Sequence, residues 1–392
     1  MDVCYQALLA GVIPDPCNSI PCYRILHVDD VGDNYHFIRK FYGLHWYFYI
    51  FFIRILTLKN PFVELRGFVK SIFVKRFNKF NGMQLQCLEI RSASLNSRPF
   101  ISIVIPTLNR YTFLKDVLFD LEKQDYSHFE VLICDQSEPF IPDFYLNWNL
   151  DIKLIRQKEM ALWLARNTCI RMARSKYILL FDDDSRVESD WIRQHLVCIE
   201  HFNVSISAGV THTLIGHGLS MKQSYYHLSD VFDTGNALVK REVFEKVGLF
   251  DRQFEGQRMG DGEFGLRALL GGFQIISNPN AKRIHLKVES GGLRQMGSWD
   301  AFKPKNLFSP RPVPSVFYFV RKYFGNENAI FLALQNIPFS FIPYRFKGNR
   351  FYKLISIVIL PFIIPVMLFD GFRSWYLSSK KLKNGSLIEP LL

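Results

Sequence analysis

The sequence predicts an α/β fold in which a mostly parallel sheet is flanked by helices, and three observations support this prediction. Apolar, β-branched runs alternate with segments of helical period along the middle of the chain. The connections between these segments are short, as in βαβ units. Acidic and hydroxyl residues stand where the expected strands end, and ligands collect at the carboxyl ends of strands in such sheets.

Four segments read as buried strands because β-branched and aromatic side chains dominate them. They are RPFISIVIPTLNR (98–110), FEVLICDQSE (129–138), DIKLIRQ (151–157) and YILLFDDD (177–184). The first run closes on Pro106, and a helix is expected to follow it with the sequence YTFLKDVLFDLEKQ. A second helix is expected over 161–175, directly before the fourth strand.

Charge divides the 392 residues into three regions, 1–98, 99–310 and 311–392. They hold 12, 25 and 11 Lys/Arg against 7, 26 and 3 Asp/Glu, so the flanks carry the positive excess. In both flanks the cations interleave with apolar runs, which favours an anionic membrane surface as partner over nucleic acid.

The flanking regions are expected to add helices to a central domain. A short strand that ends in an acidic loop is expected at 23–34, and a buried or interfacial helix at 44–56, within an N-terminal accessory region. The run at 354–369 has 16 uncharged residues, but Pro361 and Pro365 are expected to kink a helix there. We expect interfacial or re-entrant helices in a membrane-associating C-terminal region; a kinked span and a soluble helical cap are the alternatives.

Cysteine usage and the N-terminal residues bear on location. Seven cysteines are present without a Cys-x-x-Cys pair, and the odd count predicts reduced thiols instead of a disulfide framework. The first residues carry no basic leader, so no secretory signal is expected. With the basic flanks, this predicts a protein at the cytoplasmic face of a membrane.

Three consecutive carboxylates follow the fourth strand in FDDDS (181–185). A solvated turn or a helix cap would explain such a cluster. An Asp-x-Asp at a strand end also suits Mg²⁺ or Mn²⁺, which take oxygen ligands and share them with substrate phosphates. Thr107 and Asp135 are expected at the same edge of the sheet, and this favours the metal.

Six motifs in this region resemble those of family 2 glycosyltransferases. In order they are ISIVIPTLNR, VLICDQS, ARN, LLFDDDS, DTGNALVKREVFEKVGLFD and GDGEFGLRALLGG, and they cover roughly 100–295. The resemblance implies a GT-A catalytic domain over 99–310 and a metal-dependent, inverting, hexosyltransferase-type enzyme of polysaccharide biosynthesis. It also implies a nucleotide-diphosphate sugar donor, Mg²⁺ or Mn²⁺, and a glycan or lipid-linked acceptor.

The resemblance assigns donor-side roles by position in these motifs. Thr107 and Asp135 would hold the base and ribose, Asp182 would reach sugar or ribose hydroxyls, and Arg166 would face the donor. The middle carboxylate, Asp183, would face elsewhere and be the most replaceable of the three. The positions assigned to donor binding are Pro106, Thr107, Asn109, Asp135, Arg166, Asp182, Asp183, Gly235 and Asn236, and the last two lie in a loop on the acceptor side.

The metal and the catalytic base are assigned in the same way. Asp184 would ligate the metal, with Asp182 as a further ligand. His285 would be another ligand; a contact to a donor phosphate and a structural role are its alternatives. Asp261 would be the base, because an inverting transfer is one displacement in which the acceptor hydroxyl loses its proton.

Two departures from the family pattern stand beside Asp261. Gly260 replaces a glutamate, and Glu263 replaces an aspartate. They keep open the alternative of a non-catalytic nucleotide-sugar-binding or assembly subunit on the membrane. A nucleotidyltransferase is disfavoured, since PTLNRYTFLKD lacks the glycine-rich loop that such an enzyme needs.

Overall fold

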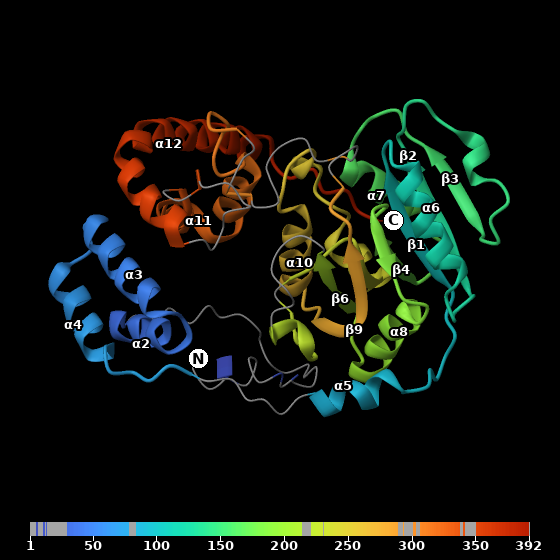
Figure 1. Ribbon diagram of the computed structural model, residues 1–392, viewed down its shortest axis with the longest axis horizontal. Helices are drawn as coiled ribbons and strands as arrows, with labels where there is room; N and C mark the ends of the chain where they lie inside the picture. The colour runs from blue at the N-terminus through green and yellow to red at the C-terminus, as the bar shows by residue number, and fades with distance from the viewer. Residues whose placement is uncertain are drawn as a thin grey trace. The chain divides into compact units, whose positions relative to one another are not determined.

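The computed structural model describes residues 30–77, 84–213, 221–229, 231–288, 306–337 and 350–391, with a few short pieces between them (Figure 1). The chain divides into two compact units, Met1–Met83 and Gln84–Leu392. The second unit therefore holds the expected catalytic region together with the C-terminal helices.

The first unit contains the helices α2 (Val31–Phe41), α3 (Leu44–Leu56) and α4 (Pro61–Ser71). The helix expected at 44–56 is confirmed. The strand expected from residue 23 lies outside the described residues. The acidic loop expected to reach residue 34 is wrong over 31–34, because Asp30 is the N-cap of α2 and accepts a hydrogen bond from the Gly32 amide at 2.8 Å.

A buried polar contact joins the helices of the first unit. Glu64 is 2% exposed and accepts hydrogen bonds from the Tyr35 hydroxyl and the Arg54 guanidinium, both at 2.7 Å. Tyr47 stacks on Phe68 beside this pair, with ring centroids 4.5 Å apart. The hydrogen-bonded charge of Glu64 and the aromatic core beside it explain how the three short helices of the first unit pack together.

Within the described residues, a nine-stranded sheet forms the centre of the second unit, with the strand order β3-β2-β1-β4-β8-β6-β9-β5 and with β7 paired to β9. The four strands β3, β2, β1 and β4 are parallel, and β8 runs antiparallel to both β4 and β6. This confirms the α/β class and the four strands expected from the sequence. The strands are β1 (Ile101–Thr107), β2 (Phe129–Asp135), β3 (Ile152–Arg156), β4 (Tyr177–Phe181), β5 (Ser185–Val187), β6 (Ile206–Thr213), β7 (His227–Leu228), β8 (Asn236–Lys240) and β9 (Ile275–His285).

Helices pack on this sheet and beside it (Figure 1). Helix α7 lies against β1 and β2, and α8 lies against β6 and β9. Both helices expected from periodicity, α6 and α7, are confirmed. The helices of the second unit are α5 (Gln84–Arg91), α6 (Tyr111–Glu122), α7 (Leu162–Met172), α8 (Trp191–Phe202), α9 (Arg241–Val247), α10 (Gly260–Leu270), α11 (Pro314–Asn336) and α12 (Arg350–Asn384).

Helices α11 and α12 pack against each other (Figure 1). Helix α11 consists of two pieces that meet at Gly325, whose φ of 83° only glycine adopts easily. Helix α12 continues through Pro361 and Pro365. Across the helices formed by described residues, none has the length and apolar character that crossing a membrane requires.

The segment after α12 returns to the sheet. The Leu249 amide donates to the Glu389 carbonyl at 2.8 Å, and the Arg252 amide donates to the Leu387 carbonyl at 3.2 Å. Leu391 is 5% exposed and belongs to the main hydrophobic core. The C-terminal residues are thus part of the fold that supports the site.

Candidate functional site

The candidate site lies where β1, β2 and β4 end. Pairing between β1 and β4 stops at Val104 and Leu180, whereas pairing between β1 and β2 continues to Thr107 and Asp135. Pro106 has no amide hydrogen to extend the ladder toward β4. The chain after β4 is therefore free to turn, and it places three carboxylates beside the end of β1.

Asp182 is held by two buried arginines. Arg166 Nη2 lies 2.6 Å from Asp182 Oδ1, and Arg283 Nη1 lies 2.9 Å from Asp182 Oδ2. Arg283 also pairs with Asp233 at 3.1 Å, and these carboxylates raise the Arg283 pKa although burial acts to lower it. Arg166 is fully buried and contacts Asp182, and its expected role in facing a donor stays a prediction.

Asp183 faces the same edge as its neighbours, so the expectation that it points elsewhere is wrong. Its carboxylate accepts hydrogen bonds from Thr107 Oγ1 at 2.8 Å and from Arg110 Nη1 at 3.0 Å. Burial raises the pKa of Asp183 to about 7, although the Arg110 charge acts in the opposite direction. The residue ties the end of β1 to the loop after β4, which argues against its being the most replaceable of the three carboxylates.

Asp184 contacts His285 and Arg110. His285 Nε2 lies 3.3 Å from Asp184 Oδ1, and Arg110 Nη1 lies 3.0 Å from Asp184 Oδ2. Burial acts to raise the pKa of Asp184, but the hydrogen bond and charge of His285 together with the charge of Arg110 lower it. The carboxylate is therefore held in its charged, metal-binding form.

Asp182, Asp184 and His285 form a group that could hold a metal ion. One ligand atom from each lies within 4.8 Å of the others. Two carboxylate oxygens suit Mg²⁺ or Mn²⁺, and the imidazole nitrogen favours Mn²⁺ of the two, because Mg²⁺ is bound mainly by oxygen. The donor set fits the divalent cation that the sequence predicts.

Asp135 is completely buried at the end of β2. Its Oδ2 accepts hydrogen bonds from the hydroxyls of Tyr111 at 2.7 Å and Tyr145 at 2.8 Å, and its Oδ1 accepts one from the Ser137 amide at 2.8 Å. Both tyrosine hydroxyls thus bond to the same carboxylate oxygen, and burial raises the pKa of both tyrosines. The role of Asp135 in holding a base or ribose stays a prediction.

Asn109 shapes the turn after β1. Its φ is 54°, in the left-handed region that asparagine tolerates. The Asn109 amide donates to Ser137 Oγ and its side-chain oxygen accepts from the Glu138 amide, both at 2.8 Å. These bonds hold together the loops that follow β1 and β2.

Gly235 lies against the acidic cluster and has no room for a side chain. A Cβ at this position would lie 1.6 Å from Arg283 Nη1 and 2.2 Å from Asp182 Oδ2. Glycine is therefore needed so that the chain before β8 can approach this ion pair.

Asn236 does not line an acceptor site, contrary to the expectation from the sequence. Its side chain is fully buried, and all four of its hydrogen-bonding positions are used. Its oxygen accepts from Trp191 Nε1 at 2.8 Å and His195 Nε2 at 3.1 Å, and its nitrogen donates to the carbonyls of Val210 and Ala281 at 3.0 Å. Asn236 is a structural residue in the middle of the sheet.

Asp261 lies in the first turn of α10 and is partly exposed. The residue before it, Gly260, faces the indole ring of Trp163, and a Cβ there would lie 2.3 Å from a ring carbon. Trp163 therefore occupies the space that a glutamate at position 260 would need. The same ring lies 5.2 Å from the Arg166 guanidinium carbon, which connects the start of α10 to the arginine that holds Asp182.

Glu263 is buried below Asp261 and does not reach the surface. It pairs with Arg267 at 3.0 Å within α10, with Lys322 at 3.2 Å, and with the Tyr323 hydroxyl. Lys322 and Tyr323 belong to α11, so this cluster joins α10 to the C-terminal helices.

Sequence reasoning did not identify Arg110 or Arg283. Arg283 is two residues before His285 in β9, and residues two apart in a strand face the same side. That spacing could have identified it. Arg110 directly follows the TLN segment, and its cation beside an acidic edge was the available signal.

Comparison with known proteins agrees with this geometry. Residues 102–228 match the model of the family described as Glycosyl transferase family 2. The chain is 25% identical over 270 residues to chondroitin synthase of Pasteurella multocida, covering 55% of this chain and 26% of that protein. It is 24% identical over 211 residues to a protein of Methanococcus voltae, and the match covers 46% of this chain and 65% of that protein. That protein is dolichyl N-acetyl-alpha-D-glucosaminyl phosphate 3-beta-D-2,3-diacetamido-2,3-dideoxy-beta-D-glucuronosyltransferase.

The fold is also that of a solved glycosyltransferase. The structure of GalNAc-T7 with UDP, GalNAc and Mn²⁺ superposes with a TM-score of 0.50 at 15% identity, covering 71% of this chain and 57% of that one. The chain spans only 18% to 65% of the length of the curated relatives. Residues 102–228 thus match glycosyl transferase family 2, and the second unit has the GT-A fold.

Proposed function

We propose that this protein is an inverting glycosyltransferase that moves a sugar from a nucleotide-diphosphate sugar to an acceptor hydroxyl. The observation that carries the proposal is the group of Asp182, Asp184 and His285 at the carboxyl edge of the sheet, in a domain of glycosyl transferase family 2. GalNAc-T7, which shares the fold, was solved with UDP and Mn²⁺.

The donor would bind with its diphosphate at this group of ligands. A bound Mn²⁺ or Mg²⁺ would neutralise charge on the leaving nucleoside diphosphate. Arg110 already spans Asp183 and Asp184 with one nitrogen, at 3.0 Å from each carboxylate. Its guanidinium adds a second cation, with hydrogen-bond donors suited to phosphate oxygens.

Asp261 would act as the base. Its partly exposed carboxylate at the start of α10 is available to an acceptor hydroxyl. As that oxygen attacks the anomeric carbon, the carboxylate takes the proton while the bond to the nucleoside diphosphate breaks. One displacement inverts the anomeric carbon, and no covalent enzyme intermediate is needed.

The proposed acceptor is a glycan or lipid-linked glycan at the cytoplasmic face of a membrane. Two relatives are named for building such products, chondroitin synthase and the dolichyl-linked transferase. The exposed cations and apolar side chains of α12 support the membrane location.

The test is release of nucleoside diphosphate by the purified full chain, with Mn²⁺ and a panel of nucleotide sugars and acceptors. Asp261→Asn should abolish turnover and keep donor binding, whereas Asp184→Asn should lose Mn²⁺-dependent donor binding. Asp143→Asn is the matched control, because Asp143 is exposed in a short turn away from β4.

Equal turnover by Asp261→Asn and the wild type would contradict the assignment of the base. Donor binding without turnover, on every sugar and acceptor tried, would favour the non-catalytic subunit. One observation favours this second function: Trp163 occupies the space that the family's glutamate would need at position 260.

A further inference from the structure

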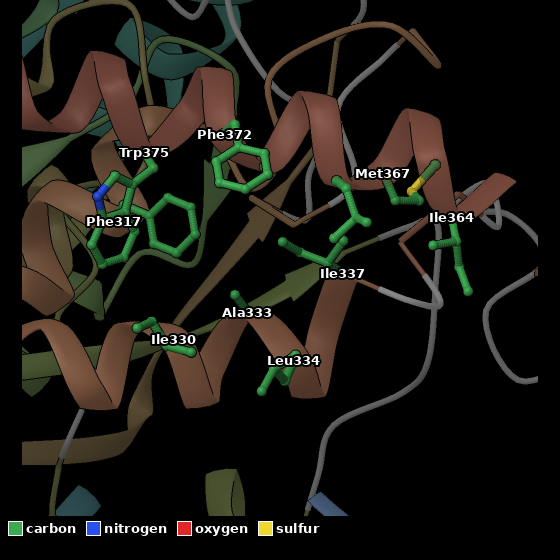
Figure 2. Close-up of a pocket in the computed structure, with 11 residues that line it drawn as sticks. Phe317, Ile330, Ala333, Leu334, Ile337, Ile364, Met367, Phe372 and Trp375 are labelled. Atoms are coloured by element: carbon green, nitrogen blue, oxygen red, sulfur yellow. The ribbon is translucent and has the colours of Figure 1, made fainter. Parts of the chain in front are cut away.

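An apolar groove of about 390 Å³ lies between α11 and α12 (Figure 2). Ile330 and Ala333 of α11 face Met367, Phe372 and Trp375 of α12 across it. Every lining residue is apolar, aromatic or glycine. The volume falls within the range of about 300–1,000 Å³ that small-molecule sites occupy.

The groove continues into exposed apolar surface. Phe372 is 72% exposed, Leu368 is 57% exposed and Ile330 is 48% exposed. Phe362 and Phe369 of α12 are 82% and 62% exposed. Proteins rarely leave apolar side chains together in water unless the surface binds a partner.

The charge beside the groove indicates the partner. Helix α12 contains six Lys/Arg and one acidic residue, Asp370. Asp370 is fully buried and pairs with Arg311 at 3.5 Å and with Arg373 at 3.4 Å. Among the side chains of α12 that the structure describes, the exposed charges are therefore cations, including Arg373, Lys380 and Lys383.

Basic side chains also lie over aromatic rings along this part of α12. Lys380 lies 4.8 Å over the ring of Tyr376, which follows the groove residue Trp375. Long basic side chains beside aromatic rings suit the boundary between acyl chains and headgroups, because the stem stays in an apolar surrounding and the charge reaches water.

We propose that this groove takes an acyl chain of an anionic membrane phospholipid, with Arg373 and Lys380 at the headgroup. The inference rests on the proposed membrane location and not on the proposed sugar transfer. An apolar groove open to the surface suits a hydrocarbon chain, and the cations select the anionic headgroup.

Trp375 reports directly on the proposed ligand. Vesicles of phosphatidylglycerol with brominated acyl chains are added to the full chain, and the Trp375 emission is taken as the difference between wild type and Trp375→Phe. We expect this emission to be lost on binding. Vesicles of brominated phosphatidylcholine should quench it much less, and Arg373→Gln should weaken the difference between the two lipids.

A variant that fills the groove tests the site itself. Ala333→Phe places an aromatic ring between the helices without changing charge, and we expect it to retain the thermal transition of the wild type and to lose the quenching. Full quenching in Ala333→Phe, or equal quenching by both lipids, would overturn the proposal. Two other results would also overturn the proposal. One is quenching that occurs only when polyprenyl phosphate is added, and the other is a dimer that forms without lipid and that Ala333→Phe dissociates.

Sugar transfer is measured separately with a water-soluble acceptor. Quenching without turnover would count against the proposed function and leave the lipid groove standing. Turnover without quenching would count against the lipid groove and leave the proposed sugar transfer standing.

Discussion

Replacing Gly235 by alanine is expected to disable the candidate site while the chain still folds. The added Cβ would lie 1.6 Å from Arg283 Nη1 and 2.2 Å from Asp182 Oδ2. Carbon contacts are comfortable only at roughly 3.5 Å or more. Both partners must therefore retreat by more than about 1 Å from positions set by buried contacts.

The magnitude follows from what Asp182 does in the site. It is one of the three candidate metal ligands, and it bonds to Arg166 at 2.6 Å and to Arg283 at 2.9 Å. A misplacement of 1 Å in a reacting group costs on the order of 100-fold in rate. The disturbed buried contact costs about 1–3 kcal/mol of unfolding free energy, less than the roughly 5–15 kcal/mol that folded proteins possess.

The assay is the initial rate of nucleoside diphosphate release with Mn²⁺, beside calorimetric binding of the nucleoside diphosphate. Gly262→Ala is the matched control, because its Cβ would meet only Met259 Cε, at 3.5 Å. The control should keep the wild-type rate. If Gly235→Ala also kept that rate and the donor affinity, the argument that Asp182 and Arg283 must hold these positions would be refuted.

Three further outcomes are expected. Burial lowers the pKa of His195 from 6.5 to about 4, so the unfolded state takes up a proton at a higher pH than the folded state does. The contribution of His195 to stability is therefore complete above pH 6.5, and the unfolding free energy falls by about 3 kcal/mol as the pH drops to 4. In His195→Gln, the urea midpoint should depend less on pH than it does in the wild type. Asn236→Ala removes the hydrogen-bond partner of four buried groups and should lower the unfolding free energy, measured by urea titration, by about 3 kcal/mol or more. An unchanged urea midpoint would contradict the structural role of Asn236. Deleting residues 385–392 removes the bonds to the 249–252 loop and the buried Leu391, and should lower the melting temperature by several degrees, unlike removal of an unpacked tail.

The fold was predictable where local pattern and tertiary contact agree. The strands that become β1 to β4 are apolar runs of ordinary strand length between helical segments, so periodicity was enough to find them. The convergence of Asp182, Asp184 and His285 at one edge was also predictable, from strand ends and the family motifs.

The predictions that were wrong or absent share a physical origin, because long-range contacts and not the local sequence pattern decide these positions. Asp183 was expected to face elsewhere, but the chain leaves β4 at Phe181 and turns, and this brings all three carboxylates to the same edge. Gly235-Asn236 reads as a turn, yet Asn236 begins β8, which lies between β4 and β6 inside the sheet. The tail to Leu391 has no periodicity of its own, and only its long-range contacts bury it.

Helix α11 contributes Ala333 to the groove and Lys322 to the cluster around Glu263. Two helical pieces joined at Gly325 therefore connect the candidate lipid site to the support of α10. Coupling between two binding equilibria is reciprocal, so a lipid that tightens donor binding by some factor is itself bound more tightly by the same factor when donor is present. Dwell time on the membrane would then follow the supply of nucleotide sugar.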